Sequence, residues 1–408
     1  MTSAWRPLRH ATFRAMWIAS VVSNIGTWMH TVAAGWLMTT MAASPLLVAL
    51  VQTATTLPVF LLSLPSGAVA DLVDRRRLLI FTQSWMLAAA ALLGILTAMG
   101  VIGPWWLLAL TFALGLGAAM NGPAWSAAVP ELVPREELAA AVALNSVGFN
   151  IARAIGPALG GMVMAASNAG IVFLLNAISF LAVIMVLWDW RYTRPVADVP
   201  DPRFRDAVGE GLRYVRSSRI YHAVLVRAGL FAFAGSALWA MLPVVASAEL
   251  GSTSTGYGIL LGCLGAGSVI GAASLAPLRR RYSPDALLAA GVVLFALATA
   301  ALALLHQFAL VAAAMLMGGV AWMMVMTTFN VSAQMAPPAP LRARALAIYI
   351  VAFQGGLAFG SSAWGAIAGK TGVRGALLAA VAMMLAGLAA GTRLRLTPTV
   401  VQDHEYAA

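Results

Sequence analysis

The chain has 408 residues, of which 61% are hydrophobic and only 10% are charged, and its mean hydropathy is +0.88. These values exclude an ordinary water-soluble globular protein and indicate a chain with many membrane-spanning helices. The net charge of +11 comes from arginines between the apolar stretches, where the positive-inside rule accounts for it, so no nucleic-acid partner is expected.

Twelve apolar stretches follow one another along the chain. Each is long enough to cross a hydrocarbon core of about 30 Å, which takes about 20 helical residues. Each must be a helix, because lipid leaves an open backbone without hydrogen-bond partners. The predicted spans are residues 13–40, 45–69, 78–100, 104–128, 139–165, 170–188, 220–247, 256–277, 286–306, 309–333, 343–369 and 373–392. The basic residues before the first span are expected to lie at the membrane interface and not to form a cleaved signal peptide.

The positions of the basic residues predict how the chain crosses the membrane. All but four of the 25 Lys and Arg residues fall near the termini or in alternate connections. The exceptions are Arg153 and Arg227 within spans, and Lys370 and Arg374 in one of the opposite loops. Because basic loops stay on the cytoplasmic side, both termini of this multi-pass protein are expected in the cytoplasm.

One long connection, residues 189–219, divides the spans into two groups of six. Its stretch FRDAVGEGLRYVRSS alternates arginines with apolar residues at helical spacing, which predicts an amphipathic helix on the inner membrane face. We therefore expect a six-helix bundle over 1–188, a linker over 189–219, a second six-helix bundle over 220–395 and a short tail over 396–408. The protein is expected to be a monomer.

The two groups repeat one another. GAVADLVDRRRLL at 67–79 aligns with GAASLAPLRRRYS at 271–283, an offset of 204 residues. At the same offset, Gly156 and Gly161 align with Gly360 and Gly365. Two unrelated stretches that share one offset indicate two pseudo-symmetric halves, with a substrate path between them near the membrane midplane.

The stretch at 67–79 resembles the signature loop between the second and third helices of the major facilitator superfamily. In that motif a glycine, an acid and a basic pair stand at fixed spacing, here Gly67, Asp71, Arg75 and Arg76. The match departs at Leu72, where a basic residue is usual, and at Asp74, where glycine is usual. Asp74, together with residues 121–161, is similar to the bacterial efflux branch that includes enterobactin-exporter-like and macrolide-efflux-like proteins.

This resemblance runs from about residue 8 to 392. It implies the major facilitator fold, an all-α membrane protein of twelve transmembrane helices in two pseudo-symmetric six-helix bundles, located in a bacterial inner membrane. Positive-inside topology explains Arg75 to Arg77 but not Asp71 and Asp74, since acids contribute little to topology. We expect Gly67, Asp71, Asp74, Arg75 and Arg76 to form a gating latch, in which Gly67 allows close helix approach; the alternative is a plain cytoplasmic loop.

A second motif, ARAIGPALGG at 152–161, lies in the fifth span. Ala152, Gly156 and Gly160 recur at four-residue steps and offer a small face for helix packing. Pro157 lacks an N–H, so the carbonyl of Arg153 loses its helical partner and a bend is expected there. The stretch resembles the antiporter motif of exporters, although Ala152 stands where its fuller form has Gly; the residues are Arg153, Gly156, Pro157, Gly160 and Gly161. The alternative is packing alone.

Charged and polar residues inside the spans mark the expected substrate path. An arginine within a membrane is costly, so Arg153 is expected to be a site or coupling residue, or else to bond neighbouring carbonyls. Arg227 either joins the path or reaches the inner surface. His30 either exchanges a proton or packs as a neutral side chain. The path candidates are Asn24, Trp28, His30, Gln52, Asn121, Trp125, Asn145, Asn150, Arg153, Asn176, Arg227, Asn330 and Gln354.

An enzyme is not expected, because the sequence has no metal-binding spacing, no nucleophile beside a base and no phosphate loop. We predict neither a cofactor nor a metal.

The leading hypothesis is a proton-linked secondary transporter that exports a small amphipathic compound, a drug or a siderophore-like metabolite, by alternating access. Its partners would be that small molecule, protons and membrane lipids. The alternatives are an uptake permease and a lipid-moving or non-transporting membrane scaffold.

No carboxylate falls at the membrane centre. The proton carrier would therefore be His30, Asp71, Glu249 or the substrate itself. A site for lipophilic cations would place an acid in the apolar cavity, whereas Arg153 favours a planar anion. We expect anionic or neutral aromatic or amphipathic substrates rather than quaternary-ammonium dyes.

Overall fold

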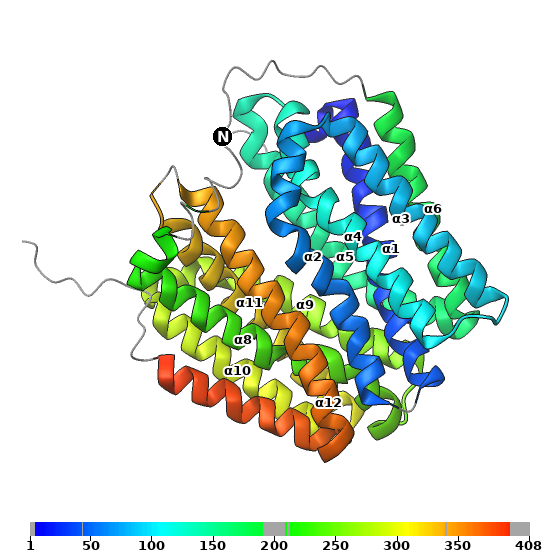
Figure 1. Ribbon diagram of the computed structural model, residues 1–408, viewed down its shortest axis with the longest axis vertical. Helices are drawn as coiled ribbons and strands as arrows, with labels where there is room; N and C mark the ends of the chain where they lie inside the picture. Colours follow the sequence, from blue (N-terminus) through cyan, green and yellow to red (C-terminus); the bar gives the residue numbers. More distant parts are fainter. Residues whose placement is uncertain (1–4, 43, 191–208, 210–212, 339–340, 392–408) are drawn as a thin grey trace, which may run out of the picture.

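The computed structural model describes residues 5–42, 44–190, 209, 213–338 and 341–391. The first half of the chain forms one group of helices, blue to green at the upper right of Figure 1. Its members are α1 (Ala11–Met41), α2 (Pro45–Leu72), α3 (Arg75–Ala98), α4 (Pro104–Ala128), α5 (Leu138–Ala166) and α6 (Ala169–Asp189). Three short 3-10 helices accompany them, η1 (Arg6–Arg9), η2 (Val129–Glu131) and η3 (Arg135–Glu137).

The second half forms the other group, green to red at the lower left of Figure 1. Its helices are α8 (Arg219–Val244), α9 (Ser254–Arg281), α10 (Pro284–Leu304), α11 (Phe308–Met335) and α12 (Arg342–Gly391), and a π-helical turn, Val245–Glu249, follows α8. α12 contains both of the last two predicted spans. They are separated at Gly372, whose φ of +77° is a left-handed conformation that glycine adopts without steric cost.

Polar side chains and prolines fix where several helices begin. Asn168 caps α6 by accepting from Ile171 N, and Ser218 caps α8 by accepting from Tyr221 N. Each cap satisfies a backbone N–H that has no partner inside the helix. Proline stands in the first turn of α2, α4 and α10, where its missing N–H costs nothing.

The predicted fold class is confirmed. By length and composition ten described helices qualify as membrane spans, with α12 counted once and α1 outside the set. With α1 and both segments of α12, the described chain holds the twelve helical segments that the sequence predicts. The halves meet where α5 packs against α9 and α2 packs against α12.

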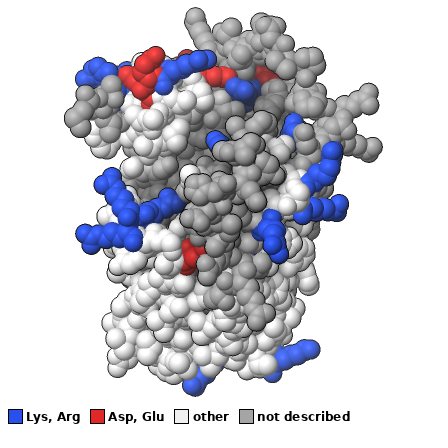
Figure 2. Space-filling view, turned by 90° about the vertical axis from the view of Figure 1, so that its left-hand side faces the viewer, with Lys and Arg blue, Asp and Glu red and all other residues white. Residues whose placement is uncertain are grey.

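The basic clusters differ from the sequence prediction, which placed them in connections. Arg75–Arg77 form the first turn of α3, and Arg279–Arg281 form the last turn of α9. We call this end of the molecule, where α1 and α3 begin, the basic end. Figure 2 looks onto the left-hand side of Figure 1, and Lys and Arg side chains lie on several parts of this face.

The expected amphipathic helix falls mostly outside the described residues. Residues 213–217 are helical; within them Val215 is buried while Arg213 and Arg216 are exposed, as the pattern predicts. The Tyr214 hydroxyl donates to the Ala336 carbonyl at 2.8 Å, which ties this turn to the end of α11.

Candidate functional site

A cavity of about 380 Å³ lies between the two halves. α1, α2 and α5 supply one wall, and α8, α11 and α12 supply the other. The lining residues are Trp28, Thr31, Gln52, Thr55, Phe149, Arg153, Trp239, Trp322, Phe353, Gln354 and Leu357. Both halves thus contribute to one site, as the repeat predicts.

Arg153 carries the charge of this central cavity. Its side chain is only 9% exposed, and its guanidinium carbon lies 5.7 Å from the ring centre of Trp28 and 5.6 Å from that of Trp239. These are cation–π contacts, one from each half. Within the described part of the chain no carboxylate forms a salt bridge with it, and its Nε is buried without a hydrogen-bond partner.

The wall from the second half is aromatic. The ring of Trp322 lies 5.3 Å from Trp239, and 6.0 Å from Phe353, centre to centre, both edge to face. Such pairs pack rigidly and stabilise one another by about 0.5–1.5 kcal/mol beyond their buried area. The opposite wall is more polar, since it presents the side chains of Thr31, Gln52 and Thr55.

His30 lies beside the central cavity and not in it. It lines a smaller cavity of about 20 Å³ together with Gln52, Trp239 and Tyr257. Its ring packs 4.8 Å from the ring of Phe173, and both ring nitrogens are buried without a partner among the described residues. A buried imidazole with two unsatisfied nitrogens is unusual, because buried polar groups are normally hydrogen-bonded.

Four of the predicted path residues line the central cavity, namely Trp28, Gln52, Arg153 and Gln354. Asn24, Asn150 and Asn330 instead donate to carbonyls one turn earlier in their own helices. Asn121 accepts from Thr82 and Gln83, Trp125 packs against neighbouring apolar side chains, and Asn145 is half-buried away from the cavity.

Sequence reasoning did not single out the residues Thr31, Thr55, Phe149, Trp239, Trp322, Phe353 and Leu357. A signal was present for the two tryptophans. Both lie inside their spans, whereas tryptophans of the membrane interface stand at span ends.

Arg227 belongs to a different place. Its side chain is 8% exposed and donates to Asp285 at the start of α10 at 2.5 Å. It lines a small separate cavity of about 30 Å³ with Phe231, Phe329 and Met384, all from the second half. The structure therefore places this arginine in an ion pair inside one half and not among the residues of the central cavity.

The glycines of the α5 motif lie at helix contacts. A Cβ at Gly156 would stand 2.6 Å from Trp28 Cβ, and one at Gly160 would stand 2.6 Å from Met29 Cα, so both pack α5 on α1. A Cβ at Gly161 would clash with the carbonyl of Ser254 in α9. α5 stays one helix through Pro157, and the carbonyl of Arg153 that Pro157 leaves unpaired is covered by Gly265 of α9.

The predicted latch residues make contacts within the first half. Asp74 caps α3, with its Oδ1 accepting from Arg77 N at 2.9 Å. Arg75 forms an ion pair with Glu131 just after α4. A Cβ at Gly67 would meet no atom of the described residues within 4 Å, and the close helix approach expected there stays a prediction. The Asp71 side chain lies outside the described residues.

Arg76 ties the basic end of α3 to α6. Its Nε donates to the Leu187 carbonyl at 2.8 Å, and its Nη2 donates to the Trp188 carbonyl at 2.7 Å. These carbonyls belong to the last turn of α6, where a cation is favourably placed.

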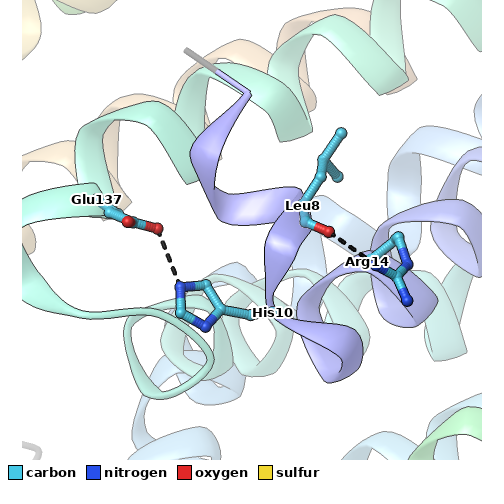
Figure 3. Close-up of polar contacts among 4 residues, drawn as sticks. All are labelled: Leu8, His10, Arg14 and Glu137. Carbon is cyan, nitrogen blue, oxygen red and sulfur yellow. Dashed lines mark hydrogen bonds and ion pairs between the residues drawn. The ribbon is translucent and has the colours of Figure 1, made fainter. Parts of the chain in front are cut away.

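The start of the chain is fixed to α5 by a pair that sequence reasoning did not foresee. His10 Nε2 lies 3.1 Å from Glu137 Oε2, and Arg14 donates to the Leu8 carbonyl at 3.2 Å (Figure 3). η1 and the first turn of α1 are thereby held against the start of α5.

Two helical halves that face one another across a central cavity are typical of a transporter of the major facilitator type. The chain belongs to the transmembrane secretion effector family, whose model matches residues 2–407. The resemblance to the major facilitator superfamily is thus confirmed. Among the described residues, no group of three His, Cys, Asp or Glu side chains is placed to hold a metal ion.

Several curated relatives are transporters. The chain is 31% identical over 171 residues to the staphyloferrin A transporter of Staphylococcus aureus (strain NCTC 8325 / PS 47), an alignment covering 41% of this chain and 43% of that protein. It is 22% identical over 268 residues to macrolide efflux protein A of Streptococcus pyogenes, covering 64% of each. These two matches thus span less than two thirds of each relative. A match to the multidrug efflux pump Tap of Mycolicibacterium fortuitum is 25% identical over 391 residues and covers 91% of this chain and 93% of that one.

The fold matches solved transporters at low identity. A bacterial homologue of the human lysosomal transporter Spinster, in an inward-facing and unoccupied conformation, gives a TM-score of 0.75 at 15% identity, covering 97% of this chain and 98% of that one. The nucleoside transporter NupG gives a TM-score of 0.71 at 13% identity, covering 94% and 98%. At such identities the likeness shows the fold alone.

Proposed function

We propose that this protein exports a small amphipathic compound, a drug or a siderophore-like metabolite, across the bacterial inner membrane by alternating access coupled to protons. The observation that carries the proposal is the central cavity, which is built by both halves and contains the buried cation Arg153. A cavity at the interface of two repeats is where rocking of one half against the other would expose a ligand to each side in turn. The relatives named for macrolide efflux and multidrug efflux support export as the direction.

The conformation supports alternating access. The halves touch at the end opposite the basic end, where Trp36 of α1 stacks on Tyr257 of α9 with ring centres 6.1 Å apart. At the basic end, by contrast, no atom of the described residues lies within 4 Å of a Cβ built at Gly67. If the basic end is cytoplasmic, as the arginine distribution predicts, this is an inward-facing arrangement with both termini inside. A major facilitator neighbour crystallised inward-facing shares the fold.

Alternating access gives each segment of the chain its own role. Residues 1–188 and 220–395 act as the two moving bundles, with 189–219 as the strap between them. The latch residues Gly67, Asp71, Asp74, Arg75 and Arg76 keep the basic end of the first half in place in one conformation and let it move in the other. We expect a monomer to suffice, because both halves of one chain supply walls of the central cavity.

Proton coupling rests on His30. The cavity lining offers no carboxylate among the described residues, whereas His30 adjoins it and shares Gln52 and Trp239 with it. A neutral buried histidine in this conformation would take up a proton when the opposite end opens to water.

Transport into inside-out membrane vesicles tests the proposal. A candidate compound is first chosen by the resistance that the protein confers on a host lacking its own pumps. Acidifying the vesicle lumen should then drive uptake of that compound, and collapsing the pH gradient should stop it. Uptake only in right-side-out vesicles would show an import permease, and no movement in either orientation would overturn the transport proposal for that compound.

A further inference from the structure

The central cavity presents a cation that the protein itself does not neutralise. Arg153 is nine-tenths buried. Among the described residues it forms no salt bridge, and its Nε has no hydrogen-bond acceptor. Leaving a buried charge unpaired is costly, and the cost falls when an opposite charge arrives. Its cation–π contacts with Trp28 and Trp239 offset only part of this cost.

The lining also determines the sign of charge that is accepted. Of the eleven lining residues, all described, Arg153 is the one that carries a charge, and none is acidic. A cationic ligand would meet aromatic faces, but it would lose its hydration beside another cation with no carboxylate in the lining to offset the repulsion. An anion would gain a bidentate partner, since the planar guanidinium fork matches a carboxylate.

The walls beside Arg153 favour a flat ring. Trp28 and Phe149 come from the first half, and their rings lie 6.3 Å apart, centre to centre. Trp239, Trp322 and Phe353 form the continuous aromatic wall of the second half. A ring joined to the anion would therefore meet aromatic faces from both halves.

The volume limits the size of the ligand. The cavity of about 380 Å³ is at the lower end of the range of about 300–1,000 Å³ for drug-sized ligands. A compact ligand of one or two fused rings fits this space, whereas a large macrocycle would require the halves to move apart.

We propose that the central cavity selects small aromatic carboxylates, with the carboxylate held by Arg153 and the ring held between the aromatic side chains of the two halves. This inference rests on the proposed function for its biological meaning, because it names the class of compound that the transporter moves. It concerns binding alone, so it can fail or hold independently of export.

Equilibrium dialysis of the purified full-length protein tests the inference with three probes that share one ring system. They are 2-naphthoate, the neutral 2-naphthamide and the cationic 2-naphthylmethylammonium. We expect 2-naphthoate to bind at least about tenfold more tightly than the amide, the difference that one charge-assisted hydrogen bond provides, and the ammonium to bind most weakly. Equal or tighter binding of the amide or the ammonium would overturn the inference without any variant being made.

Variants then assign the preference to one residue. Arg153→Gln should abolish the advantage of 2-naphthoate over 2-naphthamide, and an unchanged size-exclusion profile of the purified variant shows that it is folded. Arg153→Lys, which keeps the charge but loses the planar fork, should give an intermediate preference. The matched control is Arg77→Gln, which removes the same charge from an exposed position at the basic end and should leave all three affinities unchanged. A loss in Arg77→Gln equal to that in Arg153→Gln would assign the preference to overall charge and refute the site.

The two proposals fail in different ways. If 2-naphthoate binds with the expected preference but no compound is exported by vesicles, the inference on ligand class stands and the transport proposal falls. If export is observed but only for neutral or cationic compounds, and Arg153→Gln leaves it unchanged, the transport proposal stands and the ligand class is wrong.

Discussion

Gly161 and Gly365, which lie 204 residues apart, each pack against the first turn of a helix from the opposite half. Ser254 and Thr255, at the start of α9, donate from their hydroxyls to the Gly161 carbonyl at 3.2 and 3.3 Å. A Cβ at Gly365 would stand 2.5 Å from Ala49 Cβ and 3.0 Å from Leu46 Cα in α2. The two interfaces between the halves are therefore built from equivalent positions of the repeat.

Substitution at one of these glycines is expected to push the halves apart. Gly365→Ala should lower the free energy of unfolding by about 1–3 kcal/mol, because an extra methyl group would overpack the α2–α12 interface. Gly369→Ala is the matched control on the same helix, since a Cβ there meets nothing within 4 Å. Thermal unfolding in detergent measures both variants. Equal midpoints for the two would show that the interface tolerates a side chain at Gly365.

These glycines illustrate which structural features can be predicted from the sequence alone. The spans and the repeat were predictable because apolar length and a shared offset are visible in one dimension. The rotation of each helix was not, because helices that face both lipid and protein are apolar all round. That is why the sequence identified Trp28 and Arg153 but missed Trp239 and Trp322, and why it placed Asn150 on the path although Asn150 bonds to its own helix.

The partner of Arg227 could not be predicted for a different reason. Asp285 lies 58 residues further along the chain, at the start of α10, and only tertiary packing brings the two together. The basic clusters were likewise predicted as loops, yet α3 begins at Arg75, directly after the cap residue Asp74. A capping acid can start a helix in a run of arginines because it satisfies a free N–H of the first turn.

Asp71 is expected to act in gating. Asp71→Asn should slow transport several-fold without changing the amount of protein in the membrane, because an amide keeps the shape but loses the charge that a latch needs. Initial rates in inside-out vesicles measure the effect. Glu136→Gln, a change at an exposed acid of the same end, is the control and should transport normally. A normal rate in Asp71→Asn would remove this residue from the latch.

His30 is expected to act in coupling and not in ligand binding. His30→Gln should reduce transport driven by a pH gradient, because glutamine cannot exchange a proton. Ligand affinity measured without a gradient should be unchanged, since His30 lies outside the central cavity. His222→Gln, at an exposed histidine near the start of α8, controls for the loss of any histidine. If His30→Gln keeps the full response to the gradient, the proton takes another route.

The Arg227–Asp285 pair is expected to stabilise the second half without selecting the ligand. Its side chains are 8% and 27% exposed, so removing one partner leaves the other charge in a poorly hydrated place. Arg227→Met and Asp285→Asn should each lower the free energy of unfolding by about 3–5 kcal/mol, or somewhat less for the partly exposed Asp285. The double variant Arg227→Met/Asp285→Asn should recover much of this loss, because no unpaired charge remains. Thermal unfolding of the four proteins completes the double-mutant cycle, in which additive losses would show that the two charges do not interact. The preference among the naphthyl probes should stay the same in every folded variant, since Arg227 lines the small cavity inside the second half and is not among the residues of the central cavity. A change of preference in the double variant would instead connect that cavity to the ligand site.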